Sequence, residues 1–152
     1  MPRRRLLLAL LLLPLPAVAQ APVGGNRPPP PPLPPLPQIA LTRGIVALTP
    51  ESWRVEFLPD RDVLEVGQRV VLGRIGAALN TGSVGRITLV SEVGSGDDLS
   101  TTRRLSLVRA RAVKAALVAG GLAETRVDIR ALGHTIAQRD SVDILTPTAP
   151  RP

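Results

Sequence analysis

The sequence has no cysteine, one histidine, one tryptophan, one phenylalanine and no tyrosine among its 152 residues. The absence of cysteine excludes disulfides, thiolate metal sites, cysteine nucleophiles and a lipid-modified cysteine within this sequence. A single histidine leaves little basis for a histidine-rich metal site or a histidine-based triad. The scarcity of aromatic residues excludes most surfaces on which nucleic-acid bases stack. We therefore expect no cofactor, no metal ion, no enzymatic activity, no lipid anchor and no nucleic-acid partner.

Arginine and proline are present in quantity, and both gather near the N-terminus. Three of the 19 basic residues fall within the first five positions, so part of the formal net charge of +7 belongs to that segment. Eight of the ten residues from Pro28 to Pro37 are proline. A hydrophobic share of 44% over 152 residues is sufficient for one ordinary domain with tails.

Residues 1–19 have the three-part organisation of a secretory signal peptide. Three arginines precede an apolar run that begins at Leu6, and Ala17-Val18-Ala19 is the small-x-small pattern suited to signal peptidase. The alternative is an uncleaved membrane anchor, but the apolar stretch covers about 14 residues and a spanning helix needs about 20. We expect export, with cleavage after Ala19.

Residues 20–38 form a proline-rich linker. Consecutive prolines cannot enter a helix or a sheet and favour polyproline II, in which ten residues extend about 30 Å. The alternative is a ligand for a proline-reading domain, because PPLPPLP contains a PxxP motif. We expect a semi-rigid spacer that holds the following domain away from another structure.

Residues 39–146 carry the patterns of one folded domain, and residues 147–152 form a disordered tail. Apolar alternation and helical periodicity predict, in order, strand, helix, strand, helix, strand and strand at 53–57, 64–79, 86–93, about 100–119, 126–131 and 141–145. Residues 39–48 add a short strand or an extended lead-in. Helical connections favour right-handed crossovers. The predicted fold class is α/β, an α+β two-layer sandwich with both helices on one face of a mixed sheet.

Smaller signals mark the ends of these elements. Asn80–Gly82 and Gly120–Gly121 predict the ends of the two helices, and Ser100 or Thr101 is the expected N-cap of the second. Phe57 is expected to anchor the core.

The second helix carries one charge on its apolar side. Arg109 falls within the arc formed by Leu105, Val108, Ala112, Val113, Ala116 and Leu117, whereas Arg103, Arg104, Arg111 and Lys114 lie on the opposite arc. A guanidinium on the core side must snorkel outward, pair with a carboxylate or meet a ligand anion. Its partner is therefore either an internal acid (Asp60, Asp62, Asp97 or Asp98) or a ligand.

The second helix and the strand after it, residues 105–127, resemble the LSxxRAxxVxxxLxxxGxxxxRV run of the OmpA-like C-terminal domain family. Phe57 and Asp62-Val63-Leu64 are similar to the strand-to-helix connection of that family, and the resemblance extends from about Trp53 to Leu145. It implies a β-α-β-α-β-β fold and non-covalent binding of peptidoglycan. It also implies that Arg109 grips the diaminopimelate of the stem peptide together with the aspartate of a GHTD motif.

The sequence departs from this family at several points. Gly94 stands where the GHTD aspartate is expected, and the closing NRRV run aligns with Arg139-Asp-Ser-Val142. Gly133-His134-Thr135 resembles GHT, but we expect it to follow the third predicted strand. Restoring the missing acid by Gly94→Asp is expected to strengthen binding.

Two hypotheses follow from the resemblance. In the first, this is a periplasmic domain, associated with peptidoglycan or the outer membrane, that binds the stem peptide weakly. Arg109 would contact the carboxylate, Glu92, Asp97 or Asp98 would receive the ammonium, and amides from Gly94 onward would complete the pocket. Asp97 and Asp98 alternatively cap the helix. In the second hypothesis, a degenerate domain binds no ligand and serves as an envelope scaffold for a protein partner.

Overall fold

The structure is a computed structural model that describes residues 33, 35–49 and 51–147. The predicted signal peptide, most of the predicted linker and most of the predicted tail lie outside the described residues. The elements are β1 (Ile45–Thr49), β2 (Ser52–Glu56), α1 (Val66–Gly82), β3 (Ile87–Val93), α2 (Leu99–Ala119), the 3-10 turn η1 (Glu124–Arg126), β4 (Val127–His134) and β5 (Ser141–Leu145). None of the described helices has the length and apolar character to cross a membrane.

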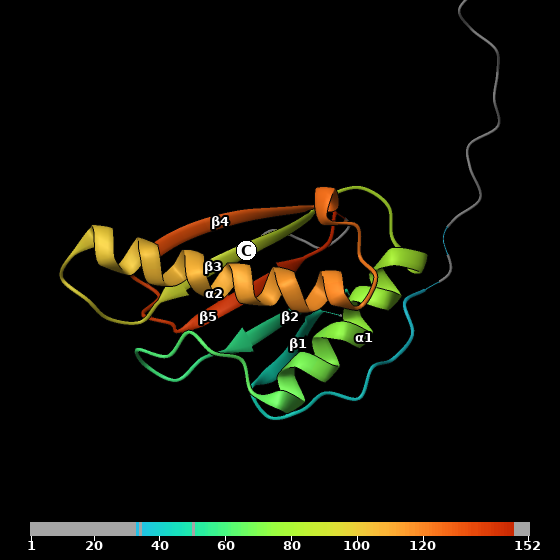
Figure 1. Ribbon diagram of the computed structural model, residues 1–152, viewed down its shortest axis with the longest axis horizontal. Coiled ribbons are helices and arrows are strands. Elements are labelled where there is room, and N and C mark those ends of the chain that lie inside the picture. The colour runs from blue at the N-terminus through green and yellow to red at the C-terminus, as the bar shows by residue number, and fades with distance from the viewer. Residues whose placement is uncertain (1–32, 34, 50, 148–152) are drawn as a thin grey trace, which may run out of the picture. The chain divides into compact units, whose positions relative to one another are not determined.

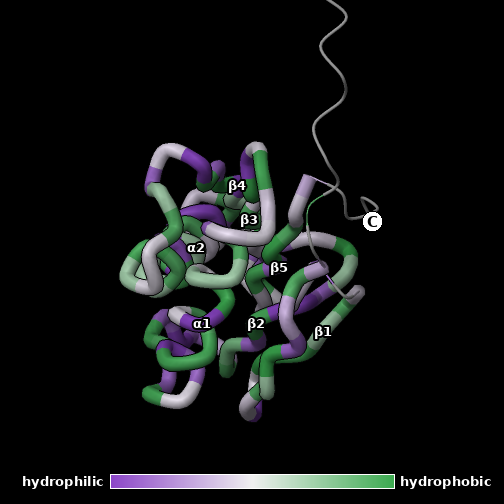
Figure 2. The backbone as a smooth tube through the Cα atoms, turned by 90° about the vertical axis from the view of Figure 1, so that its right-hand side faces the viewer, coloured by the Kyte–Doolittle hydropathy of each residue, from purple (hydrophilic) through white to green (hydrophobic). Residues whose placement is uncertain are grey.

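The five strands form one mixed sheet in the order β1-β2-β5-β3-β4. The β3–β4 pair is parallel, as the α2 crossover between them requires, and the remaining pairs are antiparallel. The last strand, β5, therefore lies in the middle of the sheet (Figure 1). Both helices lie on one side of the sheet (Figure 2), which confirms the predicted two-layer sandwich.

The hydrophobic core lies between the two layers. Trp53 and Val55 of β2 face the helices and stand opposite Ile144 and Val142 of β5. Phe57 continues the same alternation just beyond β2 and is 9% exposed, so the structure confirms it as a core residue. Leu36 and Ile39, before β1, also pack against this core.

The two helices approach each other closely at glycines. A Cβ at Gly76 of α1 would collide with the carbonyl oxygen of Leu117, and a Cβ at Gly120 would collide with that of Gly73. Gly120 therefore both follows the last residue of α2, as predicted, and lets α1 pass.

The ends of several elements differ from the predictions. The stop predicted at Asn80–Gly82 is wrong, because α1 continues through Gly82 and the Ser83 hydroxyl donates to the Leu79 carbonyl. The N-cap of α2 is Asp98, whose carboxylate accepts from the Thr101 amide, and not Ser100 or Thr101. The segment at 39–48 contains a strand, β1.

The strand β4 is longer than predicted, so Gly133 and His134 belong to it rather than following it. Gly133 has φ +74°, and its amide donates to the Ser106 hydroxyl of α2 at 3.1 Å. A Cβ there would lie 3.0 Å from atoms of Thr102 and Arg103. The glycine thus allows close contact between β4 and α2.

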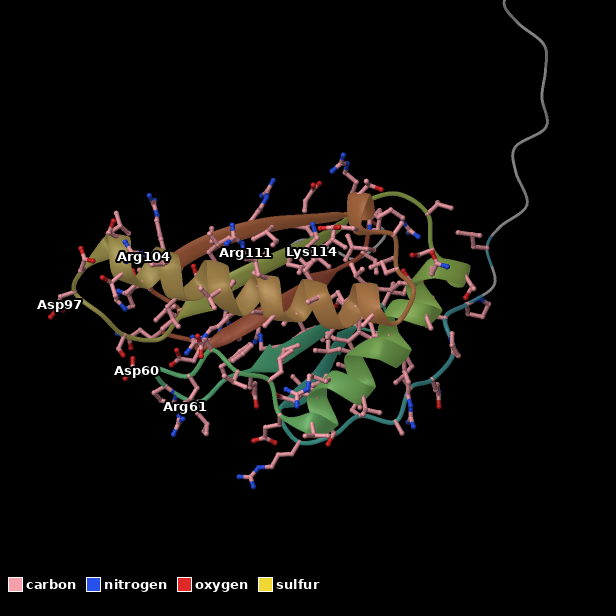
Figure 3. All side chains as sticks on the ribbon, in the orientation of Figure 1. Asp60, Arg61, Asp97, Arg104, Arg111 and Lys114 are labelled. Carbon is pink, nitrogen blue, oxygen red and sulfur yellow. The ribbon has the colours of Figure 1, made fainter. Side chains whose placement is uncertain are left out.

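The buried face of α2 is rotated slightly from the predicted arc. Val108 is 38% exposed and Leu105 is half-buried. Buried residues follow helical spacing at Thr102, Ser106, Arg109, Val113 and Leu117. Arg109 therefore lies in the middle of the buried stripe, while Arg104 and Arg111 project from the exposed face (Figure 3).

Candidate functional site

Arg109 has the largest fully buried side chain among the described residues, with no exposed surface. Its Nε donates to the carbonyl of Arg61 at 2.7 Å and its Nη2 to the carbonyl of Leu58 at 3.1 Å. Its Nη1 donates to Asp140 Oδ1 at 2.7 Å and to the carbonyl of Glu92 at 3.4 Å. One side chain thus joins the loop after β2, the end of β3 and the residue before β5.

Phe57 and Asp140 complete this arrangement. The guanidinium carbon of Arg109 lies 5.1 Å from the centroid of the Phe57 ring, within the range of a cation–π contact. The Phe57 amide donates to the carbonyl of Asp140 at 2.8 Å. Burial of an always-charged group is costly unless it is paired and hydrogen-bonded. The site meets this requirement with four oxygen acceptors and one aromatic face.

Asp140 is the acid that pairs with Arg109, and it was not among the four candidates. Asp60 and Asp62 flank the carbonyl of Arg61, so their loop contributes backbone oxygens instead. Asp140 lies 31 residues from Arg109 in the sequence, in the run that aligns with the closing family motif. The acid in that run is the one feature of the sequence that could have indicated this partner. The other acceptors are backbone carbonyls, which no residue type in the sequence reveals.

Gly94 directly follows β3 and faces the Asp140 carboxylate. A Cβ at position 94 would lie 2.5 Å from Asp140 Oδ2 and 3.2 Å from its Cγ. The carboxylate therefore fills the space that a side chain at position 94 would enter.

The other proposed ligand residues lie in different surroundings. Glu92 is near the pair, because its carbonyl accepts from Arg109 and its carboxylate accepts from Arg139 at 3.2 Å. Asp98 is exposed and caps α2, with its carboxylate 2.6 Å from the Thr101 amide. This hydrogen bond lowers the pKa of Asp98. Asp97 is exposed at the tip of the loop before α2 and points outward (Figure 3).

Two cavities have Phe57 in their lining. The smaller, of about 280 Å³, is lined by Arg54, Glu56, Phe57, Arg139, Asp140 and Ser141. The larger, of about 380 Å³, includes the charged residues Arg43, Glu56, Arg61 and Glu65. In the part of the chain that the structure describes, no group of three or more His, Cys, Asp or Glu residues is arranged to hold a metal ion. The chemistry available here is recognition of charged groups by ion pairing.

Known structures share the fold. No family model and no curated protein sequence matches the chain. The OmpA-like domain of FopA1 from Francisella tularensis is similar with a TM-score of 0.53 and 16% identity, over 68% of this chain and 80% of that one. The peptidoglycan-associated lipoprotein from Burkholderia pseudomallei gives a TM-score of 0.51 and 19% identity, over 60% and 87%.

The periplasmic domain of Helicobacter pylori MotB gives a TM-score of 0.50 and 14% identity, over 64% of this chain and 76% of that one. At such identities these likenesses establish the fold alone. The chain has the fold of OmpA-like domains, as the pattern of its second helix predicted.

Proposed function

We propose that this chain is an exported cell-envelope domain that associates non-covalently with peptidoglycan through the stem peptide. The fold supports the proposal, because a protein that shares it is a peptidoglycan-associated lipoprotein. The sequence supports it through the helix motif that contains Arg109. The observation that carries it is the buried Arg109–Asp140 pair beside two cavities.

We infer that Arg109 acts mainly by positioning its neighbours. It is fully buried, so a direct grip on a diaminopimelate carboxylate requires Asp140 to leave Nη1 or a carbonyl to leave the guanidinium. In the undisturbed arrangement Arg109 holds the loop at Leu58–Arg61 and the Asp140 carboxylate in place. Both forms of the proposal make binding depend on Arg109.

Export and spacing belong to the same proposal. Residues 1–19 would direct secretion and be removed, and residues 20–38 would hold the domain off its attachment point. Periplasmic material should then begin at Gln20, which N-terminal sequencing measures. Recovery of the chain only from membranes, with Met1 intact, would contradict cleavage.

A second candidate is a scaffold domain without a cell-wall ligand. The complete burial of Arg109 favours it, because an arginine whose contacts are all internal needs no ligand. In this case Arg109 contributes stability only, and the domain contacts another envelope protein.

Cosedimentation with purified peptidoglycan sacculi separates the two candidates. The chain from Gln20 onward is compared with Arg109→Lys, which keeps the charge but loses the planar fork. Arg111→Lys is the matched control, because Arg111 is exposed on the same helix. We expect the wild type and the control to sediment with sacculi and Arg109→Lys to sediment weakly.

A thermal melt of each variant confirms that the domain is folded at the assay temperature. A folded wild type that stays in the supernatant would contradict peptidoglycan association and favour the scaffold.

A further inference from the structure

We propose that Asp140 receives a ligand ammonium group, and that its carboxylate occupies the space that a side chain at position 94 would otherwise fill. The inference rests on the proposed peptidoglycan association, and it names the residue and the chemical group that the site recognises. The ligand class is a primary ammonium group on a peptide side chain.

The first step is geometric. A Cβ at position 94 would lie 2.5 Å from Asp140 Oδ2 and 3.2 Å from the Gln138 carbonyl oxygen. Position 94 and the Asp140 carboxylate therefore compete for one space beside the Arg109 guanidinium. A glycine at 94 is what permits an acid at 140, and the acid reaches the arginine from the β5 side of the sheet instead of from the end of β3.

The second step is that Asp140 retains an acceptor. Its Oδ1 accepts from Arg109, whereas its Oδ2 has no hydrogen bond within the described residues. The side chain is 17% exposed and lines the cavity of about 280 Å³. A carboxylate has two oxygens with about four lone-pair sites, so it binds an ammonium without leaving the guanidinium.

The third step concerns the charges around that cavity. Its two arginines are already paired, Arg54 with both oxygens of Asp143 and Arg139 with Glu92. The other charged groups of the lining are the carboxylates of Glu56 and of Asp140, and Asp140 shares only one of its oxygens with Arg109. The cavity thus presents acceptors and no unpaired cation among its described lining residues. This arrangement suits a ligand cation that donates hydrogen bonds, as an ammonium does.

These contacts reverse one expectation from the sequence. An aspartate at position 94 would crowd Asp140 and place a second negative charge against it. Gly94→Asp alone should therefore weaken the site, and it should restore the site only when the acid at 140 is removed. An aspartate at 94 would then enter the space beside Arg109, after the Gln138 carbonyl shifts by a few tenths of an ångström.

The test uses nuclear magnetic resonance of the chain from Gln20 onward, titrated with 1,5-diaminopentane and, separately, with glutarate. The variants are Asp140→Asn, Gly94→Asp and Gly94→Asp/Asp140→Ala, and the control is Asp97→Asn at an exposed acid. We expect the diamine, and not the dicarboxylate, to shift the amides of residues 94, 140 and 141. Asp140→Asn should weaken this binding at least about tenfold, the effect of losing one hydrogen bond to a charged group. The control should bind as the wild type does.

The double variant keeps the test decisive if Asp140→Asn or Gly94→Asp unfolds, because it returns an acid to Arg109. We expect it to bind the diamine more tightly than either single variant. Equal diamine binding by a folded Asp140→Asn, or preference for glutarate, would overturn the inference.

Sacculus cosedimentation of the same proteins distinguishes the two proposals. A wild type that binds the diamine through Asp140 but does not sediment with sacculi contradicts peptidoglycan association alone. A wild type and a folded Asp140→Asn that sediment equally contradict the role of Asp140 alone.

Discussion

Asp140 and Asp143 stand three residues apart, one just before β5 and one inside it, and each pairs with an arginine in a different way. Asp143 lies opposite Arg54 of β2, and because its neighbours Val142 and Ile144 are core residues, it points to the other face of the sheet. It uses both oxygens, at 2.7 Å to Nε and 2.7 Å to Nη2. Asp140 lies at the end of the sheet and offers one oxygen to an arginine that also holds three backbone carbonyls.

In the Arg54–Asp143 pair both carboxylate oxygens accept from the arginine, whereas the Arg109–Asp140 pair leaves one carboxylate oxygen available to a ligand. The hydrogen bond with Asp143 raises the pKa of Arg54, which means that the pair favours the charged guanidinium. This pair joins β2 to β5. Both Asp143 oxygens already accept from Arg54, so neither is left for a ligand. The Arg109–Asp140 pair joins loops and strands at a cavity and keeps Oδ2 available. Substitutions at the two pairs should therefore affect stability and binding differently.

Removal of Arg109 should have the largest effect. Arg109→Ala leaves Asp140 and three carbonyls without their donor in a buried site, so we expect a loss of about 3–5 kcal/mol in the free energy of unfolding. Chemical denaturation measures the loss. Arg111→Ala, at an exposed position on the same helix, should stay within about 0.5 kcal/mol of the wild type. A similarly small change for Arg109→Ala would show that water replaces the guanidinium.

Phe57 lies against the Arg109 guanidinium, and truncation of its side chain should lower stability nearly as much. The ring is 9% exposed, packs in the core and faces the Arg109 guanidinium. Truncation of a buried phenylalanine usually costs about 3–5 kcal/mol, and we expect Phe57→Ala to fall in that range. Denaturant titration beside Val63→Ala, an exposed control in the following loop, tests this. A loss equal to that of the control would contradict the packing described for Phe57.

The Arg54–Asp143 pair should respond more weakly, and mainly in stability. Asp143→Asn keeps the shape but removes the charge opposite Arg54, whose side chain is 19% exposed. We expect a loss of about 1.5–3 kcal/mol, the usual contribution of a hydrogen bond to a charged group. Sacculus binding of the folded variant should fall less than that of Asp140→Asn, because Arg54 lines the cavity and loses the charge that pairs it, while Asp140 itself is unchanged. A loss of binding as large as that of Asp140→Asn would contradict the distinction between the two pairs.

The sequence was informative where the pattern is local. The bounds of β5 and the end of α2 at Ala119 were predicted from alternation and from the glycine pair. The anomalous place of Arg109 followed from helical spacing. Its acid did not, because Asp140 reaches it only after β5 inserts between β2 and β3, a pairing with no local signal. The carbonyls of Leu58 and Arg61 are backbone acceptors that any residue type provides, so no side-chain pattern in the sequence predicts them.

Substitution of Asp98 should have the smallest effect on stability, because this acid is exposed and its carboxylate caps the start of α2. It is therefore the reference against which the two buried pairs are compared. The hydrogen bond with Thr101 lowers its pKa below the ordinary value of 3.8. A carboxylate whose folded-state pKa is lowered stabilises the protein above the unfolded value, and this contribution is lost as the pH falls through the folded-state pKa. Asp98→Asn retains an acceptor without the charge, so the wild type should melt slightly above it at neutral pH, and the two melting temperatures should converge as the pH falls below 3.8 and the carboxylate is protonated. Asp98→Ala, which has no acceptor, should melt lowest at neutral pH. A difference between wild type and Asp98→Asn that is unchanged across this range would show that the charge of the cap contributes nothing to stability.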